Sequence, residues 1–266
     1  MKSKIKIFES NRSDGIISRN KKFYSPEQNK EEIDKIFLET RIKLGKKYGF
    51  NGKKIFQATQ KTENNNIEYP NGKYHIINDK DLTKEDFWYE ELICDILIIT
   101  KDYPNIVVGN QMADCPILIA EDRKKGVTAL SHCGAAYIDR NLPIQTIEAL
   151  QKSFNSNIND IYVYIGSCIR KENYIYYSYP RWAKNVKVWE NAIIKEKNLY
   201  YIDMIKAITN QLQEIGINNI EISPVDTYKD PNYYSHFSEV KGETLKIGQN
   251  FVGFFYPNDI QSWHSN

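Results

Sequence analysis

The amino-acid sequence predicts an α/β fold, a single mixed α/β domain in which layered sheets are flanked by helices. Short apolar runs of strand length are interspersed with longer segments that repeat apolar residues at helical spacing. The two kinds of segment do not alternate regularly, which argues against a simple parallel sheet. No internal repeat and no long linker divides the 266 residues, so we expect one domain over residues 1–266.

The predicted strands are apolar runs bounded by polar or turn-forming residues. They cover Ile5–Phe8, Lys54–Ala58, Lys73–Ile77, Ile93–Ile99, Cys115–Ala120, Val127–His132, Ile161–Ile165, Ile220–Ser223 and Asn250–Tyr256.

Three helices are predicted from their start signals and apolar stripes. The first has Ser25 as a candidate N-cap, Pro26 at the first helical position and Gln28 completing a capping box, and Gly49 is placed to end it. Apolar residues at helical spacing predict a second helix over 144–154. The third follows Asp203, which can cap it.

Composition restricts the classes of partner. The 36 basic and 34 acidic residues give a net charge of +2, too balanced and scattered to attract nucleic acid. No apolar run approaches the ~20 residues that span a bilayer, and the N-terminus lacks a signal-peptide pattern. The four cysteines show neither CxxC nor disulfide-scaffold spacing. We therefore expect a cytoplasmic protein with reduced thiols that binds neither nucleic acid nor membrane.

Cys115 and His132 are the strongest candidates for chemistry. Each lies on one of two predicted strands joined by the polar segment 121–126, which is typical of a hairpin connection. If Ala120 pairs with Val127, antiparallel pairing places Cys115 opposite His132, with Cβ atoms about 5 Å apart.

Three interpretations of this pair remain open from the residues alone. The thiol and the imidazole could bind zinc together with a third ligand and a water molecule. They could form a thiolate–imidazole nucleophile. Alternatively, Cys115 is a small buried side chain beside a hydrogen-bonded His132.

Motifs along nearly the whole chain resemble, in the same order, those of the laccase-domain family. Met112–Leu118 resembles the family's "T-A-D-C-x-P-v-l", although here the proline directly follows the cysteine, and Ser131–Gly134 resembles "H-A-G-W-R-G". The flanking similarities are Gly15–Arg19 to "G-v-S-T-R", Thr40–Arg41 to "N-R", Ile55–Thr59 to "l-Q-v-H", Cys94–Thr100 to "A-D-a-l-v-T", Ile165–Ile169 to "i-G-P-s-I", Asp226–Tyr228 to "d-x-C-T" and Tyr233–His236 to "f-F-S-H".

This resemblance implies a fold and an activity. The family was long labelled polyphenol oxidase or laccase-like, and its members are now regarded as purine nucleoside phosphorylases. Some members also deaminate adenosine. Its single-domain fold resembles the catalytic domain of cytotoxic necrotizing factors. The expected partners are a purine nucleoside and phosphate. Copper is implied by the family label only, whereas the motifs imply zinc, with Cys115 and His132 as two of its three ligands.

The sequence departs from the family pattern at several functional positions. Thr59 stands where the third zinc ligand, a histidine, belongs, so the zinc site is degraded. Ala135 and Ala136 replace a tryptophan and an arginine, and losing that arginine removes an anion contact. Tyr228 replaces a late cysteine, and Phe237 and Ser238 replace an arginine pair.

The remaining candidate residues follow from the same motifs. Asp114 joins Cys115 and His132 as a catalytic candidate that could orient His132 or the backbone. Arg19 and Arg41 are candidate phosphate contacts, and His236 is a spare imidazole near the site.

The leading hypothesis is a divergent purine nucleoside phosphorylase-like enzyme. The alternatives are a metal-free Cys–His hydrolase or deamidase, favoured by the missing ligand, and a binding protein that keeps the fold without activity. Phosphorolysis and metal binding would discriminate among the three.

Overall fold

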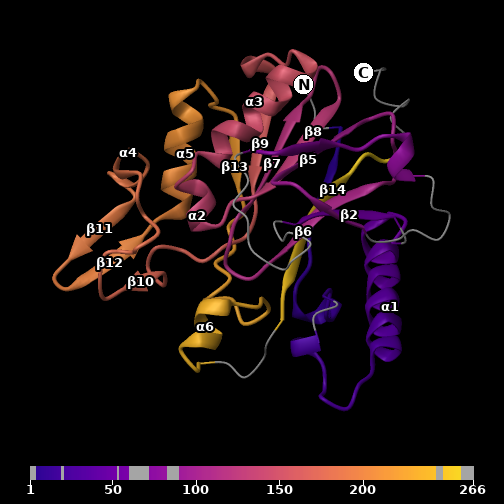
Figure 1. Cartoon of the computed structure of the whole chain (residues 1–266), viewed down its shortest axis with the longest axis horizontal. Coiled ribbons are helices and arrows are strands. Elements are labelled where there is room, and N and C mark those ends of the chain that lie inside the picture. Colours follow the sequence, from indigo (N-terminus) through magenta and orange to yellow (C-terminus); the bar gives the residue numbers. More distant parts are fainter. Residues whose placement is uncertain are drawn as a thin grey trace.

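Two β-sheets packed face to face form the centre of the structure (Figure 1). The computed structural model describes residues 4–18, 21–52, 54–59, 72–82, 90–243 and 248–258. In spatial order, the five-stranded sheet contains β1 (Lys6–Glu9), β14 (Asn250–Phe255), β6 (Val107–Met112), β2 (Ile55–Thr59) and β4 (Glu90–Ile93). The six-stranded sheet contains β13 (Ile220–Ile222), β9 (Ile161–Ile165), β7 (Ile117–Asp122), β8 (Val127–His132), β5 (Ile96–Thr100) and β3 (Tyr74–Ile76).

The helices and a small third sheet surround this centre. The third sheet projects at one side of Figure 1 and contains β10 (Ile175–Tyr176), β12 (Leu199–Ile202) and β11 (Ile193–Glu196). The helices are α1 (Lys30–Tyr48), α2 (Ala135–Ile138), α3 (Leu142–Phe154), α4 (Val186–Trp189), α5 (Met204–Glu214) and α6 (His236–Val240).

The core is divided among three apolar layers. Alternating side chains of β14, β7 and β8, such as Phe254, Ile119 and Leu130, pack between the two sheets. On the outer face of the five-stranded sheet, Leu44 of α1 packs with side chains of that sheet. On the outer face of the six-stranded sheet, α3 contributes Ile147 and α5 contributes Ile208 to a third layer. This helix–sheet–sheet–helix arrangement confirms the predicted mixed α/β fold with layered sheets and flanking helices.

Helix α1 begins four residues later than predicted. Gln28 accepts a hydrogen bond from the Ser25 N–H, but the Ser25 hydroxyl bonds Glu27 and does not cap the helix. The complete capping box is formed by Asn29 and Glu32, each accepting from the other's backbone N–H. The prediction that Ser25 caps α1 was therefore wrong. The predicted end is confirmed, because Gly49 adopts a left-handed conformation with φ 85°.

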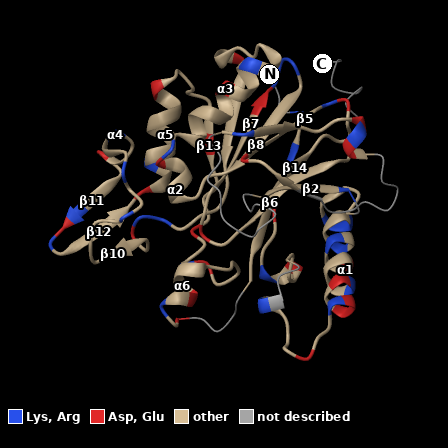
Figure 2. Ribbon diagram, in the orientation of Figure 1, with Lys and Arg blue, Asp and Glu red and all other residues tan. Residues whose placement is uncertain are grey.

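Charges along α1 complement its dipole. Acidic residues occupy the first turn and basic residues the last turn, and Figure 2 shows red at one end of the helix and blue at the other. Elsewhere on the ribbon of Figure 2, residues of both signs are interspersed.

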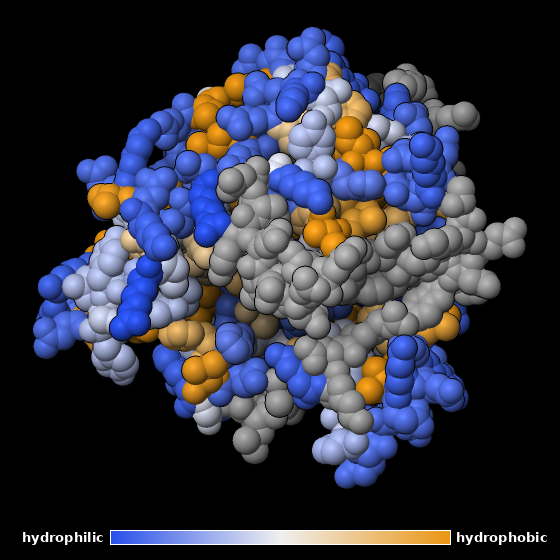
Figure 3. All heavy atoms as spheres, viewed as in Figure 1, coloured by the Kyte–Doolittle hydropathy of each residue, from blue (hydrophilic) through white to orange (hydrophobic). Residues whose placement is uncertain are grey.

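The face of the molecule in Figure 3 is mostly hydrophilic, with separate hydrophobic spots. Among the helices that the structure describes, none combines the length and apolar character needed to cross a membrane.

Candidate active site

The β7–β8 hairpin positions the two candidate residues, with a register that differs from the prediction. Strand β7 continues through Asp122, which pairs with Val127, so Ile117 and not Cys115 stands opposite His132. Glu121 and Asp122 were expected in the loop, but both are buried in the strand. Glu121 accepts from the Lys4 N–H and Asp122 from two backbone N–H groups of the turn. Cys115 therefore precedes β7, two residues before the partner of His132.

Cys115 and His132 nevertheless lie at one small cavity. A Cβ atom placed on Gly134 would stand 3.3 Å from Cys115 Sγ and 3.9 Å from His132 Cδ2, so both side chains approach the same point. The cavity has a volume of about 280 Å³. Its described lining residues come from the loop before α1, the ends of β6 and β8, the segment before β7, α6 and the segment before β14: Lys22, Phe23, Met112, Ala113, Cys115, His132, His236, Glu239, Gly248 and Gln249.

Burial keeps the thiol and the imidazole uncharged at neutral pH. It raises the pKa of Cys115 to about 12, with a smaller contribution from the negative charge of Asp114. Burial also lowers the pKa of His132 to about 4. The pair is thus a neutral thiol beside a neutral imidazole, unlike the thiolate–imidazolium pair of an activated cysteine nucleophile.

Asp114 makes its carboxylate contacts with the 226–240 segment. Its Oδ1 accepts from the Thr227 hydroxyl at 2.7 Å, and its Oδ2 accepts from the Ser235 hydroxyl at 3.0 Å and the Phe237 N–H at 2.7 Å. The side chain is buried, which raises its pKa, while these hydrogen bonds act in the opposite direction. No hydrogen bond between Asp114 and His132 is found among the described residues.

The candidate substrate-binding residues occupy different environments. His236 is an exposed residue of α6 that lines the cavity, with Nδ1 3.7 Å from the Glu239 carboxylate. Arg41 lies on the buried face of α1 and is fully buried, with its guanidinium 4.2 Å from the centre of the Phe37 ring and 5.5 Å from that of Phe251. It is absent from the described lining of the cavity. Arg19 lies outside the described residues.

Comparison with known proteins places the chain in a family. Residues 39–249 match the family model described as multi-copper polyphenol oxidoreductase laccase. The chain belongs to this laccase family. Two relatives, from Mycobacterium tuberculosis and Mycobacterium bovis, are named purine nucleoside phosphorylase. Each is 23% identical over 133 residues, which cover 50% of this chain and 53% of the relative. The match thus spans about half the length of these curated relatives.

Two solved structures share the fold of this laccase-family chain. The Bacillus licheniformis hypothetical protein YfiH superposes with a TM-score of 0.64 at 17% identity, covering 84% of this chain and 81% of that one. YlmD from Geobacillus stearothermophilus gives a TM-score of 0.62 at 16% identity, with 84% and 81% coverage. At these identities the likeness shows the fold alone.

The donor set of this laccase-family chain does not fit a metal site. Zinc in proteins takes three or four side-chain ligands, and the described residues contain no group of three or more His, Cys, Asp and Glu side chains that could hold a metal ion. Thr59, at the expected third position, ends β2 and is not among the described lining residues. No chemistry at this cavity is therefore assigned to zinc or copper.

Two charged residues of the cavity escaped sequence analysis. Lys22 adds a cation, close to the "G-v-S-T-R"-like stretch. Glu239 adds a carboxylate one helical turn after His236, and this i, i+3 spacing was the signal that could have identified it.

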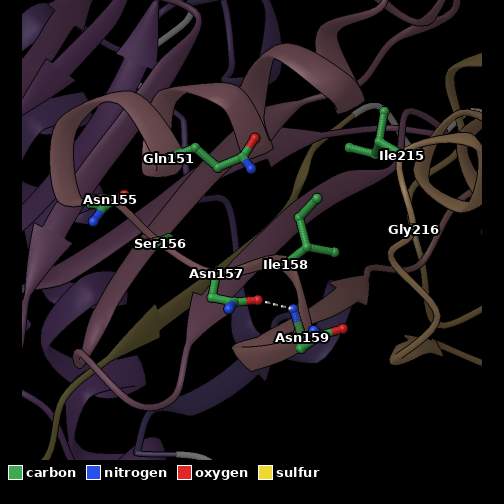
Figure 4. Close-up of a pocket in the computed structure, with 8 residues that line it drawn as sticks. All are labelled: Gln151, Asn155, Ser156, Asn157, Ile158, Asn159, Ile215 and Gly216. Carbon is green, nitrogen blue, oxygen red and sulfur yellow. Dashed lines mark hydrogen bonds between the residues drawn. The ribbon is translucent and has the colours of Figure 1, made fainter.

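A second hollow, of about 580 Å³, lies where α3 and α5 end (Figure 4). Its described lining carries no charged side chain, and its asparagines serve the local backbone: Asn155 ends α3 in a left-handed conformation, and Asn157 accepts from the Asn159 N–H. This hollow is therefore a weaker candidate for a catalytic site than the cavity at Cys115.

Proposed function

We propose that this chain catalyses the phosphorolysis of purine nucleosides such as adenosine or inosine. The observation that carries the proposal is a single cavity that brings Cys115 and His132 together with the basic residues Lys22 and His236. The names of the mycobacterial relatives support a purine nucleoside as the substrate.

In this reaction a phosphate oxygen attacks C1′ of the ribose while the bond from C1′ to the purine nitrogen breaks. The electron pair of that bond goes to the purine, which takes up the proton that the attacking hydrogen phosphate loses, and ribose 1-phosphate is the second product. Because its pKa is low, His132 is neutral and carries one ring N–H, which can donate a hydrogen bond to the departing purine. Cys115, as a neutral thiol, adds a weak donor beside it.

We assign phosphate binding to Lys22 and His236 in the cavity lining. Lys22 supplies a positive charge for phosphate, and His236 supplies a further donor. We include Arg19 in the proposal as a second phosphate contact and leave out Arg41, which is buried on the inner face of α1.

The neutral state of the pair argues against the hydrolase alternative. A cysteine hydrolase needs a thiolate, and a pKa near 12 leaves almost none at pH 7. Adenosine deamination remains a second proposed activity, with inosine and ammonia as its products. We place these reactions in the cytoplasm, where the four free cysteines would stay reduced.

A product assay tests the proposal. Purified protein is incubated with adenosine or inosine, with and without phosphate, and purine base, ribose 1-phosphate and inosine are separated by chromatography. We expect base release that requires phosphate. Base release with free ribose would indicate hydrolysis, and nucleoside binding without any product would indicate an inactive binding protein.

A further inference from the structure

We propose that Asp114 is a positioning residue that acts through α6, holding His236 and Glu239 at the cavity. This inference deepens the proposed function, because it makes the position of one wall of the cavity, the short helix α6, depend on the carboxylate of Asp114. The inference rests on the proposed function only where nucleoside binding is the readout.

The carboxylate of Asp114 joins two segments far apart in sequence. Ser235 is the N-cap of α6, and its hydroxyl both donates to Asp114 Oδ2 and accepts from the Ser238 N–H. The Phe237 N–H, in the first turn of α6, donates to the same oxygen. One buried oxygen therefore fixes the start of α6 from two directions, and Cys115 is the next residue in the chain.

The backbone at Asp114 is shaped for this contact. Its φ of 85° lies in a region that residues other than glycine rarely adopt. Its carbonyl accepts from the Ile169 N–H at 3.1 Å, which ties the bend to the segment after β9. A non-glycine residue persists in such a conformation when surrounding contacts over-determine it.

Besides its bonds to Asp114, helix α6 is held by Phe237, whose ring contacts Tyr174, Tyr176 and Tyr228. It spans five residues, too few for a stable isolated helix. Phe237 packs edge-on against Tyr174, with ring centres 5.3 Å apart, while Val240 is 69% exposed. His236 and Glu239 share the helix face that meets the cavity.

Hydrogen-bond partners on the two carboxylate oxygens provide matched variants. Ser235→Ala removes the bond to Oδ2 and also the N-cap that accepts from the Ser238 N–H, so both contacts at the start of α6 are lost. Thr227→Val removes the bond to Oδ1, which does not reach α6. Both changes leave the charge of Asp114 intact. The readout is the rate at which iodoacetamide alkylates Cys115, assigned by peptide mass mapping, because α6 lines the cavity through which Cys115 is reached.

We expect Ser235→Ala to raise the alkylation rate about five- to a hundredfold, the shift in an equilibrium that follows loss of the two hydrogen bonds made by the Ser235 hydroxyl. Thr227→Val should leave the rate near that of the wild type. Equal rates for the two variants would overturn the proposal, whatever the protein binds.

Two substitutions at position 114 separate positioning from acid–base chemistry. Asp114→Gly suits the positive φ and removes the carboxylate. Asp114→Asn keeps an oxygen for α6 and offers an N–H to the Thr227 hydroxyl, so it can preserve the fastening. We expect weaker adenosine binding by calorimetry in Asp114→Gly and recovery of most of the affinity in Asp114→Asn.

An Asp114→Asn protein as impaired as Asp114→Gly would show that the charge itself is needed, and would overturn the positioning role. If wild-type protein binds no adenosine, the proposed function fails, while the alkylation rates still decide the role of Asp114.

Discussion

Burial keeps His132 neutral, and this has a consequence for stability in acid. Its folded pKa, about 4, is below the ordinary value of 6.5, so the unfolded state binds the proton more tightly. The stability from this group is present above pH 6.5 and is lost as the pH falls toward 4. In metal-free protein we expect the wild type to lose roughly 1–3 kcal/mol of unfolding free energy over this pH range that His132→Gln does not lose. The figure is discounted because part of the His132 side chain is exposed to solvent.

Urea unfolding at a series of pH values from 7 to 4 measures this difference. The account of His132 would be contradicted if the two proteins lost stability in parallel.

We propose that the residue at position 59 limits the affinity for zinc. With Cys115 and His132 as the only ligands, we expect weak zinc binding, and Thr59→His should strengthen it by supplying a third ligand, a second imidazole, at the end of β2. Cys115→Ser should abolish the remaining binding. Titration against a chromogenic chelator measures these affinities.

His236→Ala is the control for this titration, because His236 lines the same cavity. Tight native binding that disappears in His236→Ala would show that His236 acts as the third ligand. Failure of Thr59→His to bind more tightly would refute the motif alignment at β2.

Among the structural elements, the start of α1 can be located by mutation. Asn29→Ala should lower the free energy of unfolding by about 1 kcal/mol, because it removes the side chain that accepts from the Glu32 N–H. Ser25→Ala should change it by less than about 0.5 kcal/mol, since the Ser25 hydroxyl does not cap the helix. Urea denaturation of both variants checks this, and a larger effect at Ser25 would return the cap to the position that the sequence suggested.

The β7–β8 hairpin shows how far the sequence could predict an element. Its apolar runs and its connection were predictable, but Glu121 and Asp122 resemble loop residues until their hydrogen bonds to Lys4 and to the turn are known. The resulting error was two residues, an even number, so His132 kept its face of the sheet. Tertiary contacts of this kind cannot be read from local composition.

At the scale of the whole molecule, the layer between the two sheets should dominate stability. Phe254 is fully buried there, and Phe254→Ala should cost about 3–5 kcal/mol of unfolding free energy through lost burial and the cavity left behind. Tyr177, which is 88% exposed, provides the control, and Tyr177→Ala should change the value by less than about 0.5 kcal/mol. Similar costs for the two variants would contradict the layered core.

The fold class was predictable because strand and helix periodicities depend on local sequence, and the layering follows from burying their apolar faces. The cavity was less predictable. Its charged residues, Lys22 and Glu239, come from segments more than 200 residues apart, and α6 is brought to Cys115 by contacts of Asp114 that leave no periodic signal. Motif order located Cys115, His132 and His236, but not the residues between the motifs.

Phosphate-dependent release of purine base by wild-type protein, compared with His132→Gln and Cys115→Ser, tests the central claim most directly. We expect slow release that requires phosphate and yields ribose 1-phosphate, about ten- to a hundredfold slower than in family members that keep the arginine replaced here by Ala136. It should be largely lost in His132→Gln, with circular dichroism confirming that the variant is folded. Release that needs no phosphate, or that is unchanged in both variants, would contradict the assignment of this reaction to the cavity.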